Sequence, residues 1–268
     1  MASHKLLYIC QQVAPYLKDI PQAELTRDLI QAMQERGNEI RTFMPKYGCI
    51  NERRNQLHEV IRLSGMNLII DDTDHQLIIK VASIPSARVQ IYFIDNDDYF
   101  ARKAVLYDED GAEFADNDER AIFFSRGVLE TVKKLRWEPT IIHCHGWFSA
   151  IAPAYLKEVF GDDPIFSSAK VVVTVDSYGF KSPLEAQFIE KIKGEEITGE
   201  AVDYLSDPTY ENLYRFVLEY ADGIVIGSET IDEKIMEAIR QSGKPTLEYQ
   251  DPAAEDFFDN YNNFYGSL

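Results

Sequence analysis

The sequence predicts an α/β fold: a single Rossmann-like, doubly wound domain whose sheet is mostly parallel and carries a β-rich insertion. Short continuous apolar runs, typical of strands buried on both faces, recur along the chain as "LLYIC", "VVVTV" and "IVI". Segments with helical spacing follow these runs, and helices that cover a parallel sheet produce this alternation. Between residues 46 and 96 the pattern changes to β-rich segments with polar breaks.

The first half of the chain opens with a buried strand over residues 6–13 and a helix over residues 22–36, which ends before Gly37. A second strand follows in "NEIRTFMP". The insertion, residues 46–96, contains "HEVIRLSGMNLII", "HQLIIKVASI" and "ARVQIYFIDN". These three segments predict a hairpin or a meander added to the α/β frame.

The second half begins with a long helix in "DNDERAIFFSRGVLETVKKLRW", with Asp116 or Asn117 as the candidate cap. Three strand-to-helix units follow. They are "TIIHCHG" into "FSAIAPAYLKEVF", "KVVVTVDS" into residues 183–194, and "DGIVIGS" into "ETIDEKIMEAIRQSG". We expect residues 1–250 to form this one domain.

Residues 251–268 form an acidic aromatic tail with four acidic residues, five aromatic residues and no basic residue. A solvated tail rarely carries so many rings, so we expect docking onto the domain or onto a partner. A final short helix that completes the core is an equally good interpretation.

The chain has 268 residues, with 45 acidic against 27 basic and a net charge of −18. This field would repel nucleic acid and anionic membranes, so neither is an expected partner. The apolar runs are too short to span a bilayer, and "MASHK" does not open a signal peptide. Three cysteines without a CxxC pair indicate reduced thiols, and we expect a cytoplasmic protein.

Candidate chemistry lies in the loops that follow the carboxyl ends of the strands. His143 and His145 alternate along one strand, but the sequence has no further cluster of metal ligands, so one buried and one rim histidine is the favoured interpretation. The serines at strand ends lack the GxSxG pattern of a hydrolase. The carboxylates of "IDNDDYF" and "YDEDGAEFADNDER" cannot be told from solvated turns and caps. We therefore assign no catalytic residue, metal or cofactor.

The order of the segments resembles the N-terminal domain of bacterial glycogen synthases and plant starch synthases, the ADP-glucose-dependent retaining glucosyltransferases. "LLYICQQVAPYLK" is similar to the family's first strand and the lysine of its KTGG loop. "LIQAMQERGNEIRTFMPKYGCI", "YFIDNDDYFARKAVLYDEDGAEFADNDERAIFFSRGVLE" and "PTIIHCHGWFSAIAPAYLK" resemble later family segments in order and spacing. The resemblance implies the N-terminal half of a two-Rossmann glycosyltransferase.

The resemblance also implies a set of substrate-binding residues around the acceptor and donor cleft. They are Lys18, Tyr47, Asn117, Arg120, His145 and Trp147. Three of them have equally good structural interpretations. Asn117 would then be a helix cap, Arg120 a helix-surface partner of a carboxylate, and Trp147 a core aromatic.

The glycine loop departs from the family pattern. Where the family has KTGGLAD, this chain keeps Lys18 but continues with Asp19, Ile20 and Pro21, and has Glu24 in place of the aspartate. The glycines that let the backbone approach a sugar nucleotide are gone, and a new negative charge lies beside a doubly anionic ligand. We expect this loop to hold ADP-glucose poorly.

Two polar motifs depart as well. Only Trp147 remains of the family's aspartate-tryptophan-histidine motif, because Gly146 and Phe148 occupy the polar positions. The family histidine contacts the transferred glucose, so its loss would weaken transition-state stabilisation. The threonine-valine-histidine-asparagine motif reads here with Asp176 and Ser177 at the polar positions.

Family members also carry a second Rossmann domain, which holds the ADP and phosphates, and the sequence stops before it. We therefore expect a domain that is catalytically impaired alone and retains a binding role toward an α-glucan, ADP-glucose or a protein partner. The alternative is an active glucosyltransferase half that a separate chain or a homodimer mate completes, with the aromatic tail as the candidate interface. A dinucleotide-dependent oxidoreductase is the weakest hypothesis, because the sequence lacks GxGxxG.

Overall fold

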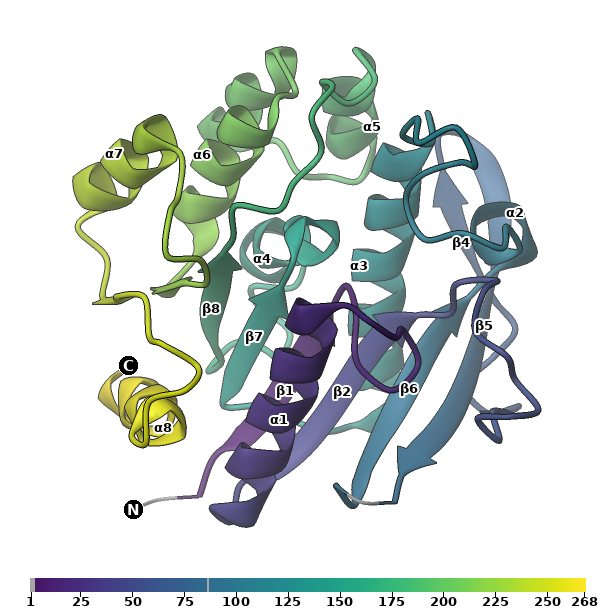
Figure 1. The fold of residues 1–268 in the computed structure, drawn as a ribbon. Coiled ribbons are helices and arrows are strands. Elements are labelled where there is room, and N and C mark those ends of the chain that lie inside the picture. Colours follow the sequence, from purple (N-terminus) through teal and green to yellow (C-terminus); the bar gives the residue numbers. More distant parts are fainter. Residues whose placement is uncertain (1–2, 86) are drawn as a thin grey trace.

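The computed structural model describes residues 3–85 and 87–268 (Figure 1). Its strands join into one sheet in the order β10-β9-β8-β7-β1-β2-β6-β5-β3, with β4 paired to β5. The strands are β1 (Lys5–Cys10), β2 (Glu39–Pro45), β3 (His58–Glu59), β4 (Met66–Ile70), β5 (Thr73–Ile84), β6 (Val89–Asp95), β7 (Ile141–His145), β8 (Lys170–Val175), β9 (Gly223–Ile226) and β10 (Thr246–Leu247).

The sheet is parallel from β10 through β9, β8, β7, β1 and β2 to β6. The central strands are buried along almost their whole length, as their continuous apolar runs predict. β5 is antiparallel to β6, to β3 and to β4. The predicted fold, a mostly parallel doubly wound sheet with a β-rich addition, is confirmed. β6 comes from the segment expected to form the insertion, yet it belongs to the parallel sheet.

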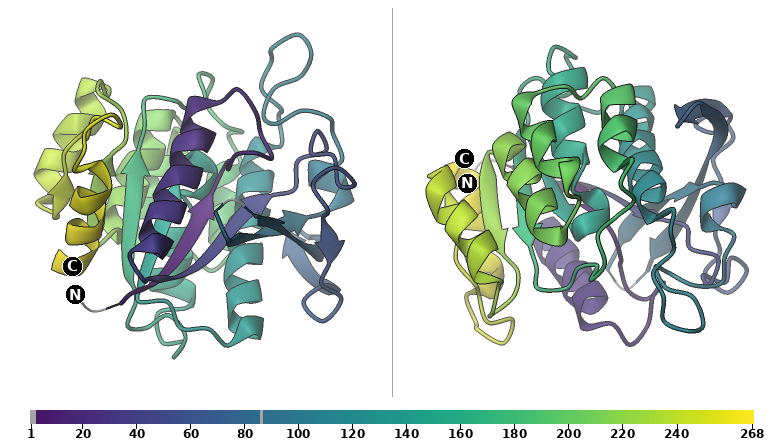
Figure 2. Two further views of the ribbon diagram at one scale, coloured as in Figure 1. Left: turned by 60° about the horizontal axis from the view of Figure 1, so that its bottom comes forward. Right: turned by 90° about the horizontal axis from the view of Figure 1, so that it is seen from above.

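Helices cover both faces of the sheet (Figures 1 and 2). α1 and α8 lie together on one face, and α3, α4 and α6 pack on the other, with α7 against α6. The helices and shorter turns are α1 (Pro21–Glu35), α2 (Asp97–Phe100), α3 (Asn117–Leu135), η1 (Trp147–Ser149), α4 (Ala152–Ala154), η2 (Tyr155–Val159), α5 (Phe188–Gly194), η3 (Glu200–Ser206), α6 (Tyr210–Tyr220), α7 (Glu233–Ser242) and α8 (Phe257–Ser267).

The aromatic tail folds as α8 and packs against the domain beside α1 (Figure 2). Its rings Phe257, Tyr261, Phe264 and Tyr265 are buried. Burying each such side chain stabilises the fold by roughly 1.5–3 kcal/mol. The tail therefore adds its rings to the core rather than extending into solvent.

Two expected helices are shorter in the structure. The segment 183–194 becomes helical only at Phe188, and before this point the backbone amide of Leu184 donates to the carbonyl of Pro208 at 3.0 Å. The segment after β7 breaks into η1, α4 and η2. Pro153 lacks an N–H and is tolerated only in the first turn of a helix, so an uninterrupted helix cannot run through it.

The helices of the described residues include none that is both long and apolar enough to cross a membrane.

Candidate functional site

A pocket opens at the carboxyl ends of the parallel strands, where ligands bind in sheets of this kind. We call it the strand-end pocket. It is small, with a volume of about 70 Å³. Strands β1, β7, β8 and β9, together with α1 and α8, contribute its walls. The polar residues among them are Gln11, Gln12, Gln22, Thr26, His145, Thr174, Asp176, Tyr178 and Tyr261.

Two glycines make room for the polar side chains of this pocket. A Cβ at Gly146 would lie 2.7 Å from Cβ of Gln11, and the backbone there has φ +79°. A Cβ at Gly227, at the end of β9, would lie 2.2 Å from Oδ1 of Asp176. Both distances are shorter than real carbon contacts, so any larger residue would displace Gln11 or Asp176.

Asp176 and His145 are the carboxylic acid and the imidazole of the strand-end pocket. Burial raises the pKa of Asp176 to about 6 and lowers the pKa of His145 to about 3. The imidazole is therefore neutral near pH 7. The described residues offer no hydrogen-bond partner to His145 Nε2, and none of their hydrogen bonds reaches the Asp176 carboxylate.

Such unpartnered groups suit a ligand with hydroxyl groups. A carboxylate accepts two or more hydrogen bonds, and charge-assisted bonds of this kind are roughly twice as strong as neutral ones. The side-chain amides of Gln11 and Gln22 supply both donors and acceptors on the same walls. No lysine or arginine is among the residues that line the pocket, so a phosphate would find a carboxylate and no cation.

The neighbouring His143 is used structurally. Its Nδ1 and the Tyr265 hydroxyl of α8 are 2.7 Å apart, and its Nε2 lies 2.7 Å from Oγ1 of Thr174. Burial lowers the pKa of His143, with a further contribution from His145 at a ring separation of 3.9 Å. His143 therefore ties α8 to the sheet, and His145 alone faces the pocket.

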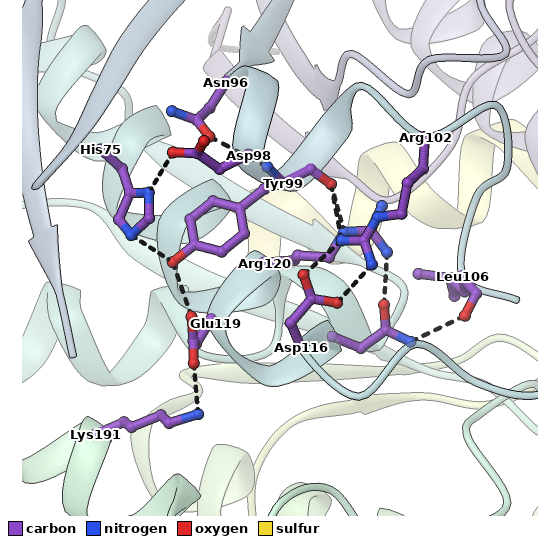
Figure 3. A network of polar contacts seen from close by, with 11 residues as sticks. His75, Asn96, Asp98, Tyr99, Arg102, Leu106, Asp116, Glu119, Arg120 and Lys191 are labelled. Carbon is purple, nitrogen blue, oxygen red and sulfur yellow. Dashed lines mark hydrogen bonds and ion pairs between the residues drawn. The ribbon is translucent and has the colours of Figure 1, made fainter. Parts of the chain in front are cut away.

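Three of the residues expected around the cleft meet in the interior instead. The Arg120 guanidinium is fully buried and lies over the rings of Phe148 and Tyr47, at 5.5 and 5.8 Å. It donates to the Tyr99 carbonyl at 2.9 Å (Figure 3). It also donates to the Asn117 side-chain oxygen at 2.6 Å. Burial lowers the pKa of Arg120 to about 10.

The helix-surface interpretation of Arg120 is wrong, because the side chain is buried and no described carboxylate lies within ion-pair distance of it. Asp116, the N-cap residue that precedes α3, makes no side-chain cap bond and pairs with Arg102 instead. The cap interpretation of Asn117 does not match either. Asn117 is the first residue of α3, and its amide donates to the Leu106 carbonyl at 3.0 Å.

Tyr47 and Trp147 are also buried. The Tyr47 hydroxyl donates to the carbonyl of Gln11 at 3.1 Å, which supports the backbone where β1 ends. Trp147 packs edge-to-face against Phe148 and Phe180, with ring separations of 5.1 and 4.9 Å. Neither ring is among the residues that line the strand-end pocket.

Lys18 is exposed and lies elsewhere on the same edge of the sheet. It lines a separate hollow between the loop after β1 and the turn after β2, together with Cys49 and Arg54. We call this the loop hollow. Of the six expected residues, His145 alone lines the strand-end pocket.

Acidic side chains gather at one further place, on α3 and just before α5. Carboxylate oxygens of Asp118, Glu119 and Glu185 lie close enough together to hold a metal ion. The Lys191 ammonium lies among them, with Nζ at 2.9 Å from Asp118 and 2.7 Å from Glu119. A single side-chain cation thus contacts all three carboxylates and offsets part of their charge. We call the four residues the Lys191 cluster.

The Lys191 cluster continues into the β-rich addition, as Figure 3 shows. The Tyr99 hydroxyl donates to Glu119 at 3.0 Å and lies 2.9 Å from Nε2 of His75. Nδ1 of His75 is in turn 2.9 Å from Asp98. This chain of contacts joins α3 to β5 and α2.

The sequence interpretation missed Gln11 and Tyr261 as pocket residues. Gln11 directly follows β1, so the rule that ligands bind at strand carboxyl ends could have found it. No local signal marks Tyr261, which reaches the pocket because α8 packs on the domain.

Comparisons with known proteins agree with this architecture. A family model described as the starch synthase catalytic domain matches residues 5–247. The chain is 38% identical over 195 residues to a glycogen synthase of Chlorobium limicola, an alignment that covers 72% of this chain and 40% of that protein. It is 34% identical over 233 residues to a glycogen synthase of Pelodictyon phaeoclathratiforme, covering 87% and 47%. The chain spans less than half the length of these relatives.

A solved structure has the same fold. The catalytic domain of Starch Synthase IV from Arabidopsis thaliana, bound to ADP and acarbose, superimposes with a TM-score of 0.75 at 17% identity. The match covers 93% of this chain and 52% of that one. At this identity the likeness concerns the fold.

Proposed function

The chain belongs to the family of starch synthase catalytic domains, as a glycogen and starch synthase-like glycosyltransferase domain, and we propose that it binds an α-glucan but transfers glucose poorly or not at all by itself. The observation that carries the proposal is the lining of the strand-end pocket. It includes the unpartnered carboxylate of Asp176 and no cation.

A neutral sugar suits such a pocket better than a sugar nucleotide. The carboxylate of Asp176 accepts hydrogen bonds from sugar hydroxyls, and the neutral imidazole of His145 offers a further polar contact. A diphosphate instead needs cations or free backbone amides, and it would be repelled by Asp176. Lys18, the one cation kept from the family loop, lines the loop hollow.

The loss of transfer follows from position 148, where the resemblance expects a histidine that contacts the transferred glucose. Phe148 has no polar atom in its side chain and is fully buried against Arg120. It cannot donate a hydrogen bond to the charge that develops in a transition state. Loss of one such donor typically lowers kcat by roughly a hundredfold or more.

Calorimetric titration of the purified chain with maltoheptaose and, separately, with ADP-glucose tests the proposal. We expect maltoheptaose to bind and ADP-glucose to bind much more weakly. His145→Asn should weaken maltoheptaose binding by about fivefold to thirtyfold, because a pocket group that meets the sugar is changed. The matched control is His58→Asn, an exposed histidine on β3, which should leave the affinity unchanged.

Micromolar binding of ADP-glucose in the strand-end pocket, or turnover by the chain alone, would contradict the proposal. The alternative, an active half completed by a second chain, is favoured by Tyr178, whose side chain is 60% exposed at the rim of the pocket. Glucosyl transfer that appears only at chain concentrations where a dimer forms, or on mixing with a second protein, would support that alternative.

A further inference from the structure

The loop hollow lies at the same edge of the sheet as the strand-end pocket but has a different lining. Its volume is about 400 Å³, within the range of small-molecule sites. The loop between β1 and α1 contributes to both sites. Gln11 lines the strand-end pocket, whereas Tyr16 and Lys18 line the loop hollow.

The loop hollow has a cationic lining, unlike four other hollows that the described residues form. Lys18 and Arg54 line it and no acidic residue does, although the chain carries a net charge of −18. Each of the other four includes a carboxylate, such as Asp176, Glu113 or Glu219.

The two cations of the loop hollow have no ion-pair partner in the part of the chain that the structure describes. No ion pair of the described chain involves Lys18 or Arg54. The nearest acids along the chain are Asp19, which is exposed, and Glu52, which lies between Lys46 and Lys80 at 2.8 Å from each. Glu52 is therefore already neutralised by other side chains.

Polar donors accompany the cations. The oxygen of the Asn51 side chain accepts from the backbone amide of Arg54 at 2.9 Å, and Asn55 donates to the Asn51 carbonyl at 2.8 Å. These bonds fix the turn and leave the NH₂ group of Asn51 for a ligand. Tyr16 also lines the hollow. It is 7% exposed, and its hydroxyl has no partner within the described residues.

We propose that the loop hollow binds a phosphate monoester carried on a sugar. The guanidinium fork of Arg54 and the ammonium of Lys18 match a phosphate dianion, and Asn51 and Tyr16 offer further donors for its oxygens. The remaining volume leaves room for a sugar ring. The anionic group of the ligand follows from the loop hollow alone, and its sugar part rests on the proposed function.

Cys49 gives a direct readout, because it is exposed and lines the hollow, whereas Cys10 and Cys144 are buried. The experiment compares the rates at which Cys49 reacts with dithiobisnitrobenzoate, which is anionic, and with neutral dithiodipyridine. The ratio of the two rates cancels the thiolate fraction and reports the local potential.

We expect the doubly substituted chain, Lys18→Gln with Arg54→Gln, to lower this rate ratio by about fivefold at low ionic strength and much less at high salt. Arg53→Gln removes an exposed charge at the residue before Arg54, outside the hollow, and should change the rate ratio by less than about twofold. Inorganic phosphate should slow both reactions in the natural chain and in Arg53→Gln, and not in the double variant. An unchanged ratio, or phosphate protection that survives in the double variant, would overturn the proposal.

Two further probes identify the source of the phosphate monoester. Glucose 1-phosphate and a phosphorylated maltodextrin are compared for protection of Cys49 in the natural chain. Stronger protection by either supports the proposal and shows whether a free sugar phosphate or a phosphorylated glucan is preferred. If inorganic phosphate protects Cys49 but neither sugar phosphate does, the inference that the ligand carries a sugar would be overturned.

ADP-glucose separates this proposal from the proposed function. If the double variant no longer binds ADP-glucose, the ligand binds in the loop hollow, and the proposal for the strand-end pocket stands. If the double variant still binds ADP-glucose, the ligand binds outside the loop hollow. Retained binding that Asp176→Lys strengthens would place a phosphate in the strand-end pocket and overturn the proposed function, without affecting the loop hollow.

Discussion

The Lys191 cluster and the strand-end pocket both bury polar side chains, but they use them differently. In the cluster, the ammonium contacts three carboxylates and Glu119 also accepts from Tyr99, although Oδ1 of Asp118 has no hydrogen-bond partner among the described residues. In the pocket, the Asp176 carboxylate and Nε2 of His145 have no hydrogen-bond partner among the described residues. Satisfied polar groups hold elements together, whereas unsatisfied ones cost stability and are retained where a ligand completes them.

Removing the cation of the cluster should have the largest effect. Lys191→Met leaves three carboxylates facing one another around a 3% exposed side chain, and breaking a buried pair in this way costs roughly 3–5 kcal/mol. Urea denaturation at pH 7 measures the change in the free energy of unfolding. Lys193→Met, on the same helix but exposed and with a single contact at 3.5 Å, should cost less than about 0.5 kcal/mol. Equal losses in the free energy of unfolding for the two variants would show that the buried contacts of Lys191 do not stabilise the fold.

Removing the Asp176 charge from the strand-end pocket should stabilise the fold, whereas removing the Lys191 charge from the cluster destabilises it. Burial raises the pKa of Asp176 to about 6, above the value near 3.9 of an unfolded chain, so the folded state binds its proton more tightly. Stability therefore falls as pH rises between roughly 4 and 6, and it stays lower above that window. Asp176→Asn removes this cost and should stabilise the chain by about 1–3 kcal/mol at pH 7.

The gain from Asp176→Asn should shrink toward zero as pH falls to about 4, where aspartate is protonated in the folded state. The same variant should bind maltoheptaose about tenfold more weakly, because a charge-assisted acceptor is lost. Denaturation curves at several pH values and calorimetry check both effects. Asp162→Asn, at an exposed site, is the control. A stability gain independent of pH would show that the Asp176 charge is not its origin.

The rim of the pocket should give the smallest effect. Tyr178 is 60% exposed, so Tyr178→Ala should change the free energy of unfolding by less than about 0.5 kcal/mol. If sugar rings stack on it, glucan affinity should fall by about threefold to tenfold. Tyr204→Ala removes a ring that is 40% exposed away from this pocket, and it should leave affinity unchanged. The same loss for both tyrosines would exclude stacking at the rim.

Much of the fold was predictable because the signal is local. The runs "LLYIC" and "VVVTV" predict buried strands from their own composition, and both lie in the parallel sheet. The place of β6 in the sheet was harder to predict. β6 follows β5 in the sequence and pairs with it in antiparallel fashion, as the second strand of a hairpin does. The parallel pairing of β6 with β2 shows that β6 also belongs to the parallel sheet.

The location of the candidate site could be predicted from the sequence, but most of the residues that line it could not. The strand-end rule located the right edge of the sheet, and the resemblance selected His145, which lines the pocket. The resemblance placed Arg120 among the substrate-binding residues, and the alternative was a helix-surface position, which arginine usually takes because it is seldom fully buried. Its burial depends on Tyr47, Phe100 and Phe148, which come from three distant segments.

By itself the sequence determined the parallel α/β frame, the net negative charge and the loss of the family's glycines and polar motifs, since each is a property of composition or of neighbouring residues. The tertiary structure decided which side chains keep no partner. Asp176 faces an open pocket because Gly227, on another strand, has no side chain to fill it. Lys18 lies with Arg54 rather than with His145 because of the path of the loop after β1. Both outcomes depend on contacts between segments far apart in the chain, which no local pattern records.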